Sequence, residues 1–118
     1  MSGPYRYIQL DYLEKMAGGD PDTRRELMFL LADELKMSSL QLNVLQRQNE
    51  PAQLKRLCHH LRTTIPFVGN SRLASLNHEM EQLLQHGNSI NRLPPLLAEM
   101  KALLSKSLEE LRRELEKG

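Results

Sequence analysis

The sequence predicts an all-α fold, an up-down antiparallel bundle of four helices with a short additional helix on its N-terminal side. Leucine, methionine and glutamate are frequent, while β-branched residues are scarce. No segment alternates apolar and polar residues with the two-residue period of a strand, whereas apolar residues recur every three or four positions between glycines and prolines. At 118 residues the chain has the size of one domain, so residues 1–118 are expected to form a single helical core.

The first two helices are expected on either side of Gly18-Gly19. A short helix that includes Leu10 and Met16 ends at these glycines. Asp20 is a suitable N-cap for the next helix, and Pro21 suits its first turn, where a missing N–H costs nothing. This second helix is expected to run to about residue 47. Its predicted core-facing residues are Leu27, Leu30, Leu31, Leu35, Leu42 and Leu45.

Three further helices follow, separated by short connections. Glu50-Pro51 opens the third. Gly69-Asn70-Ser71 closes it and starts the fourth, which is expected to stop at His86-Gly87-Asn88. The last helix starts near Pro94-Pro95 and carries a long leucine stripe toward the C-terminus. Short connections between long amphipathic helices favour antiparallel neighbours. The methionines are expected to fill gaps in the apolar stripes, at positions 16, 28, 37, 80 and 100.

Composition narrows the functional classes. Sixteen basic residues oppose fifteen acidic ones, and the chain has no tryptophan and few other aromatic residues, so nucleic-acid binding has little support. The single cysteine, Cys58, excludes an internal disulfide and fits a reducing compartment. No apolar run is long enough to span a bilayer, and the N-terminal residues lack a signal-peptide core. We therefore expect a cytoplasmic protein without membrane contact.

The third helix carries the most specific pattern, centred on His59. At 100° per residue, His59 lies roughly 140–150° from the middle of the apolar stripe and is expected to face solvent. Lys55 and Thr63 lie one turn to either side of it, and Arg62 lies three residues further on. An accessible imidazole beside cations on a rigid helix suits a transient phosphohistidine. The stripe itself consists of Leu54, Leu57, Cys58, Leu61, Ile65 and Val68.

The segment from Cys58 to Gly69 resembles the phosphorylation helix of histidine-containing phosphotransfer (HPt) domains. In the family's pattern, His59 takes the phosphorylated position, Leu61 the core leucine, Arg62 the basic position and Gly69 the distal glycine. The resemblance extends upstream to residues 10–20 and 26–31, which are similar to the family's N-terminal helices and the Gly-Asp junction between them. It covers roughly the first two-thirds of the chain.

The resemblance implies a carrier in a two-component phosphorelay. His59 would accept a phosphoryl group from a receiver-domain aspartate and pass it to another receiver, with Arg62 stabilising the phosphoryl oxygens. A docking surface would comprise Lys55, His60, Thr63 and Pro66. The expected partners are response-regulator receiver domains and a hybrid sensor histidine kinase, and a monomer is expected. The chain has no ATP site and would bind no cofactor, because the Mg²⁺ belongs to the receiver, so it would not be an enzyme in its own right.

Two departures from the family pattern bear on this site. Thr63 stands where the family usually has glycine or another very small residue, which allows a receiver's backbone to approach. Pro66 lacks an N–H for the carbonyl of Arg62 and should bend or end the helix in its last turn. His60 is the competing nucleophile, but with His60 as the phosphorylated residue Leu61 and Arg62 would fall at the wrong offsets.

Two other classes of protein fit parts of this pattern. A non-phosphorylated helical adaptor or antagonist would bind a receiver or kinase through the same face and tolerate loss of His59. An unrelated dimeric bundle would bury a second apolar surface between chains. A zinc site is disfavoured because His59 and His60 diverge, and His78 and His86 are eight residues apart. Cys58 belongs to the apolar stripe and is expected to be inert packing.

Overall fold

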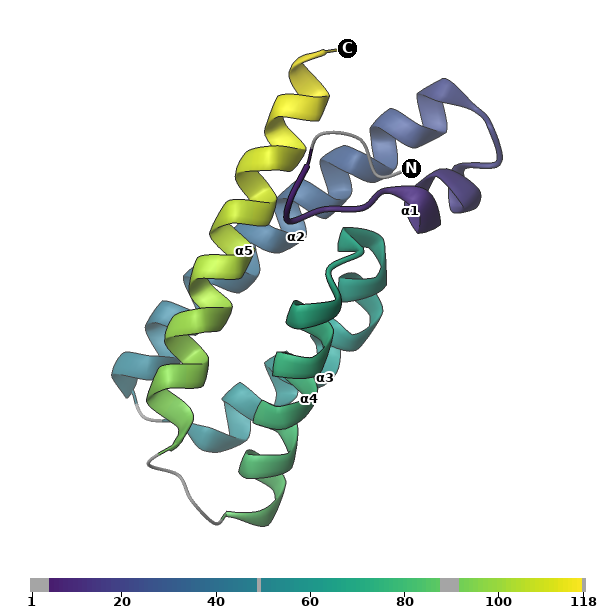
Figure 1. Cartoon of the computed structure of the whole chain (residues 1–118). Coiled ribbons are helices and arrows are strands. Elements are labelled where there is room, and N and C mark those ends of the chain that lie inside the picture. Colours follow the sequence, from purple (N-terminus) through teal and green to yellow (C-terminus); the bar gives the residue numbers. More distant parts are fainter. Residues whose placement is uncertain (1–4, 49, 88–91, 118) are drawn as a thin grey trace.

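The computed structural model describes residues 5–48, 50–87 and 92–117, and all regular secondary structure in these ranges is helical (Figure 1). This confirms the predicted all-α class. None of the described helices is long and apolar enough to cross a membrane. The five helices are α1 (Asp11–Ala17), α2 (Pro21–Gln48), α3 (Pro51–Val68), α4 (Ser71–His86) and α5 (Leu93–Glu116).

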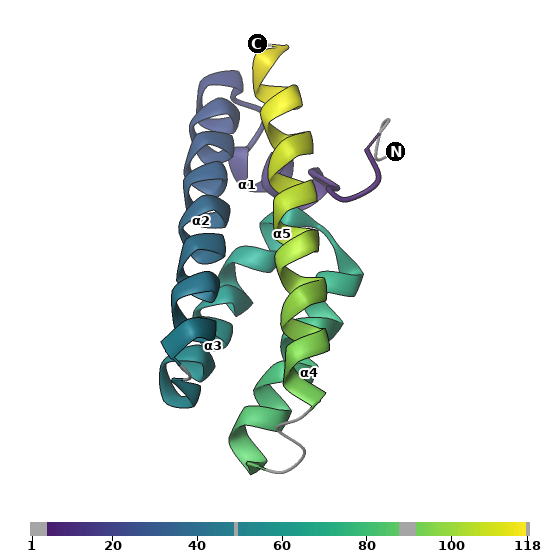
Figure 2. The same cartoon turned by 90° about the vertical axis from the view of Figure 1, so that its left-hand side faces the viewer.

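The helices form an elongated body of 45 × 22 × 22 Å. Helix α2 packs along α5, and α3 packs along α4, while the α2–α3 and α4–α5 pairs are also in contact. The short α1 packs on α2 and α3 and lies beyond the α3–α4 turn in both views (Figures 1 and 2). His59 lies on an exposed side of α3.

The core follows the predicted apolar stripes, except at Met16 of α1, which is 50% exposed, and at two residues of α2. Leu30 and Met37 were expected to face inward, but each is 56% exposed. Helix α2 buries a narrow face spaced by three and four residues, and Leu30 lies about 100° around the helix from its buried neighbour Leu31. An apolar residue next to the stripe therefore falls outside the core. The buried face of α2 consists of Met28, Leu31, Leu35, Ser38 and Leu42.

Helix α3 begins with Pro51 in its first turn, as predicted, and ends at a left-handed glycine. Pro66 was expected to bend or end the helix, but α3 continues through it to Val68. Because Pro66 lies only two residues before Val68, little of the hydrogen-bond ladder remains to be broken. Gly69 (φ +74°) then closes the helix by donating its N–H to the carbonyl of Ile65, and α4 starts after the N-cap Asn70.

The N-terminal segment before α1 is fastened to the bundle by a buried carboxylate. Glu110 of α5 accepts the backbone N–H groups of residues 6, 7 and 8 at 2.7–3.2 Å. The N–H of Gln9 donates to the carbonyl of Val68 at 2.9 Å, which joins the segment to the end of α3. Leu10 was expected inside the first helix but is its N-cap, and its buried side chain belongs to the core. The segment thereby fixes the α3–α4 turn.

Candidate functional site

His59 is held on an exposed side of α3 by the buried residues around it. Cys58 and Leu61 are fully buried, so the helix cannot rotate without exposing apolar surface. The His59 side chain is 72% exposed. Its Nδ1 lies 3.8 Å from Oε2 of Glu81, a residue of the neighbouring helix α4. The predicted accessibility of His59 is therefore found, and a carboxylate not anticipated from the sequence lies beside it.

Glu81 connects His59 with Arg62. Its side chain is only 8% exposed, and its Oε1 accepts a hydrogen bond from Nε of Arg62 at 2.8 Å. A carboxylate this buried requires a charged or hydrogen-bonding partner, which Arg62 supplies. The Arg62 side chain is itself 55% exposed, and no second hydrogen bond of its guanidinium is found among the described residues. Four N–H groups of the guanidinium therefore remain accessible for an anion.

A signal for Glu81 was present in the sequence. The buried residues of α4 are Leu73, Leu76, Asn77, Met80 and Glu81. These positions have the spacing of one helix face, so Glu81 continues an apolar stripe with a charged side chain. A charged residue at such a position is rarely buried without a partner, and this makes it a candidate for a site.

Asn77 fixes the backbone next to His59. Its Nδ2 donates to the carbonyl of Cys58 at 2.8 Å, and both residues are buried. Asn77 lies one turn before Glu81 on α4, so the same face of α4 holds both the main chain before His59 and the carboxylate beside its ring. The position of the imidazole relative to α4 is thus set by a side chain–backbone hydrogen bond in the core.

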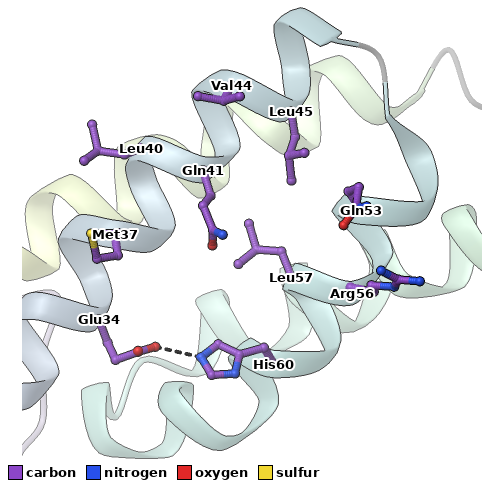
Figure 3. A pocket seen from close by; sticks show the side chains of 10 residues that line it. All are labelled: Glu34, Met37, Leu40, Gln41, Val44, Leu45, Gln53, Arg56, Leu57 and His60. Atoms are coloured by element: carbon purple, nitrogen blue, oxygen red, sulfur yellow. Dashed lines mark hydrogen bonds and ion pairs between the residues drawn. The ribbon is translucent and has the colours of Figure 1, made fainter.

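His60 is engaged differently from His59. Its Nε2 lies 2.8 Å from Oε2 of Glu34 on α2, at hydrogen-bonding distance (Figure 3). Thr63 donates its hydroxyl to the carbonyl of His60 at 3.0 Å, so the polar end of this exposed side chain is occupied within its own helix. Lys55 and Pro66 are exposed on α3, one to two turns to either side of the two histidines. The predicted docking residues therefore lie on one helix around His59.

Cys58 is part of the core, which confirms the prediction made for it. The residue is fully buried. Burial, assisted by the negative charge of Glu81, raises the pKa of the Cys58 thiol to about 12. The reactive thiolate is therefore suppressed near neutral pH, and the cysteine is not a competing nucleophile.

A groove of about 630 Å³ lies between α2 and α3 next to His60 (Figure 3). Met37, Leu40 and Val44 of α2 are exposed and recur at three- and four-residue spacing along it. Glu34 and His60 lie at one end of the groove in the view, and Arg56 lies on its α3 side. This surface was not predicted: Met37 was expected to lie in an apolar stripe, and neither Leu40 nor Val44 was assigned a role. The lining residues are Glu34, Met37, Leu40, Gln41, Val44, Leu45, Gln53, Arg56, Leu57 and His60.

No group of three histidine, cysteine or acidic side chains is placed to hold a metal ion within residues 5–48, 50–87 and 92–117. Comparisons of the chain with protein-family models, curated proteins and solved structures found no significant match. Function is therefore inferred from the residues of the site and from the resemblance of the α3 segment to HPt domains.

Proposed function

We propose that the chain is a phosphorelay carrier that accepts a phosphoryl group on His59 from a receiver-domain aspartate and passes it to another receiver. The observation that carries the proposal is the convergence of two exposed α3 side chains, His59 and Arg62, on one buried carboxylate, Glu81. The HPt-like segment of α3 supplies the expected chemistry. The up-down four-helix arrangement is proposed from the short connections between the long amphipathic helices.

The site has the parts that phosphoryl transfer needs from a carrier. A neutral imidazole nitrogen of His59 is an adequate nucleophile, and its exposure admits a bulky donor. Its lone pair would attack the phosphorus of an aspartyl phosphate; the P–O bond breaks, and its electron pair leaves with the aspartate carboxylate. The accessible N–H groups of Arg62 would hold the phosphoryl oxygens. The receiver's own Mg²⁺ would supply most of the remaining charge stabilisation, so the carrier needs neither ATP nor a metal.

Docking of a receiver requires surface beyond the histidine. Met37, Leu40 and Val44 offer an exposed apolar strip beside α3, and Lys55 and Arg56 add positive charge along that helix. A receiver carries its phosphorylated aspartate in an acidic pocket, so apolar contacts flanked by cations suit it. We propose that the partner surface consists of Lys55, His60, Thr63 and Pro66 together with this strip. The partners would be cytoplasmic response-regulator receivers and a hybrid sensor kinase, bound by a monomer.

The test is a phosphotransfer assay with ³²P-labelled receiver domains of the same organism. The wild-type chain is compared with His59→Gln and with the matched control His60→Gln. We expect an acid-labile, base-stable label on the wild type and on His60→Gln, and none on His59→Gln. Both histidines are exposed, so neither substitution should disturb the fold.

Three other results of this assay would each contradict a different part of the proposal. A label that survives in His59→Gln assigns the phosphoryl group to another residue. Absence of label on every variant, combined with measurable binding of a receiver, favours the adaptor that works without phosphorylation. If no variant takes up label and no receiver binds, the phosphorelay assignment as a whole is contradicted.

A further inference from the structure

A second hollow lies between α2 and α5 and has a volume of about 450 Å³. The two helices pack side by side and run in opposite directions (Figures 1 and 2). Gln46 near the end of α2 accepts a hydrogen bond from Lys101 near the start of α5. Arg24 near the start of α2 pairs with Glu114 near the end of α5. Between these two contacts the hollow is lined by Lys36, Ser39, Leu40, Asn43, Lys101, Ser105, Leu108 and Arg112.

Each helix lines the hollow with one of its faces. The lining positions on α2 and on α5 follow one another in steps of three and four residues, which is the spacing of neighbours on a helix surface. Ser39 lines the hollow, whereas Gln41 lines the groove beside His60. Residues two apart on a helix point about 200° from each other. The hollow and the groove therefore lie on opposite flanks of α2, and no described residue of α3 lines the hollow.

The charge of this hollow has one sign. Among the described residues that line it, the charged side chains are the cations Lys36, Lys101 and Arg112. Within residues 5–48, 50–87 and 92–117, none of these three forms an ion pair with a carboxylate. Glu109 and Glu116 line the adjoining hollow on α5, where Glu109 pairs with Arg113 at 3.1 Å. Cations gathered without a counter-charge repel one another, so a bound anion would be favourable here.

The hydroxyl of Ser39 is a second, independent indication of a ligand. Its Oγ is buried and has no hydrogen-bond partner among the described residues. Buried polar atoms are nearly always hydrogen-bonded in native proteins, so an unpartnered hydroxyl requires an explanation. The Ser39 side chain belongs to the wall of the hollow, and rotation about its Cα–Cβ bond would turn the hydroxyl toward a bound group. Asn43 and Ser105, both exposed, would add an amide and a second hydroxyl as donors.

We propose that this hollow binds an oligophosphate, an anion with two or more linked phosphoryl groups. The three cations neutralise its charge, and the hydroxyl and amide donors bind its oxygens. Lys101 and Arg112 are eleven residues apart, which is about 16 Å along α5. A single phosphate could contact both cations only if both long side chains extended toward it, whereas linked phosphoryl groups span part of that distance. The site uses no residue of α3 and does not depend on the proposed carrier function.

The experiment titrates the full chain with inorganic triphosphate by calorimetry at constant ionic strength. We expect saturable binding to one site, weakened at least about tenfold when Lys36→Gln is combined with Arg112→Gln. The control combines Lys15→Gln with Lys106→Gln, which removes the same charge from exposed positions outside the hollow and should change the affinity less than about twofold. Equal weakening in both double variants would mean unspecific attraction and overturn the proposal. Absence of binding, or orthophosphate binding as tight as that of triphosphate, would overturn it as well.

A second variant separates binding from folding. Ser39→Ala should weaken triphosphate binding about threefold or more, yet leave the free chain at least as stable as the wild type, because alanine favours the helix and removes an unpartnered hydroxyl. Ser75→Ala, at an exposed serine of α4, is the matched control and should not change the affinity. Amide resonances of Ser39 and Ser105 should shift in ¹H–¹⁵N NMR spectra on addition of triphosphate. Shifts centred on Arg62 of α3 would place the anion at the candidate site and overturn the proposal.

Discussion

Gly69 lies directly against the backbone of Gln9, so that a Cβ atom at position 69 would overlap the Gln9 carbonyl and come within 2.9 Å of its Cβ. Gly69 also has the left-handed conformation that ends α3. The distal glycine of the HPt-like pattern therefore has a structural explanation in this chain. It allows the N-terminal segment to cross the α3–α4 turn at the end of the helix that carries His59.

The first prediction follows from this contact. Gly69→Ala should lower the free energy of unfolding by about 2 kcal/mol or more, because left-handed strain adds to displacement of the N-terminal segment. Gly87→Ala is the matched control, since Gly87 also ends a helix with positive φ but has no atom within 4 Å of an added Cβ. Gly87→Ala should lower the free energy of unfolding by about 1 kcal/mol. Urea unfolding measures both, and equal losses would contradict the role of the Gln9 contact.

A second prediction concerns the apolar strip on α2. Leu40→Asp places a charge in the exposed strip beside the α2–α3 groove and should weaken receiver binding at least tenfold. Chemical phosphorylation of His59 by phosphoramidate should remain unchanged, because this small donor needs no docking surface. Ala102→Asp, an equivalent change at an exposed position of α5, is the control for added charge. Binding is measured by calorimetry, and full affinity in Leu40→Asp would place the docking surface elsewhere.

The fold class and most helix ends were predictable because their signals are local. Pro21 and Pro51 lie in first turns, and Gly69 and Gly87 end helices in the left-handed conformation. The inward face of α2 was less predictable. Between residues 27 and 42 of this helix, leucine and methionine recur one to four positions apart and so lie on more than one side. Periodicity alone therefore could not exclude Leu30 or Met37 from the core.

The residues of the candidate site on α3 could be predicted from the sequence, but their contacts with other helices could not. The exposure of His59 and its spacing from Arg62 follow from the helical period of a single segment. The contacts of Glu81 with α3 and of Glu34 with His60 depend on how α4 and α2 pack beside that segment. Such pairings join residues 22 and 26 positions apart, and no spacing rule predicts them from one sequence.

A third prediction tests the burial of the single cysteine. At pH 8 the native thiol of Cys58 should react with an alkylating reagent at least a hundredfold more slowly than in urea, because its pKa is raised to about 12 and it is fully buried. The control is Cys58→Ala combined with Ala52→Cys, which carries the thiol on the exposed first turn of α3. Its labelling should be rapid in both conditions. Rapid labelling of native Cys58 would show that α3 opens readily.

The last prediction concerns acid stability. The phenol of Tyr5 donates to Glu114 at 2.6 Å, and this bond, aided by Arg24, lowers the pKa of the Glu114 carboxyl below its ordinary value of 4.5. A carboxyl with a lowered folded-state pKa stabilises the fold above pH 4.5, and that contribution is lost as the pH falls through the lowered value. Glu114→Gln should therefore cost about 1 kcal/mol at pH 7 and progressively less below pH 4.5. Glu116→Gln, exposed on the same turn, should cost little at either pH. The free energy of unfolding of each variant is measured from pH 7 to pH 3. If Glu114→Gln loses the same stability at every pH, the charged Glu114 carboxylate is not the source of that stability.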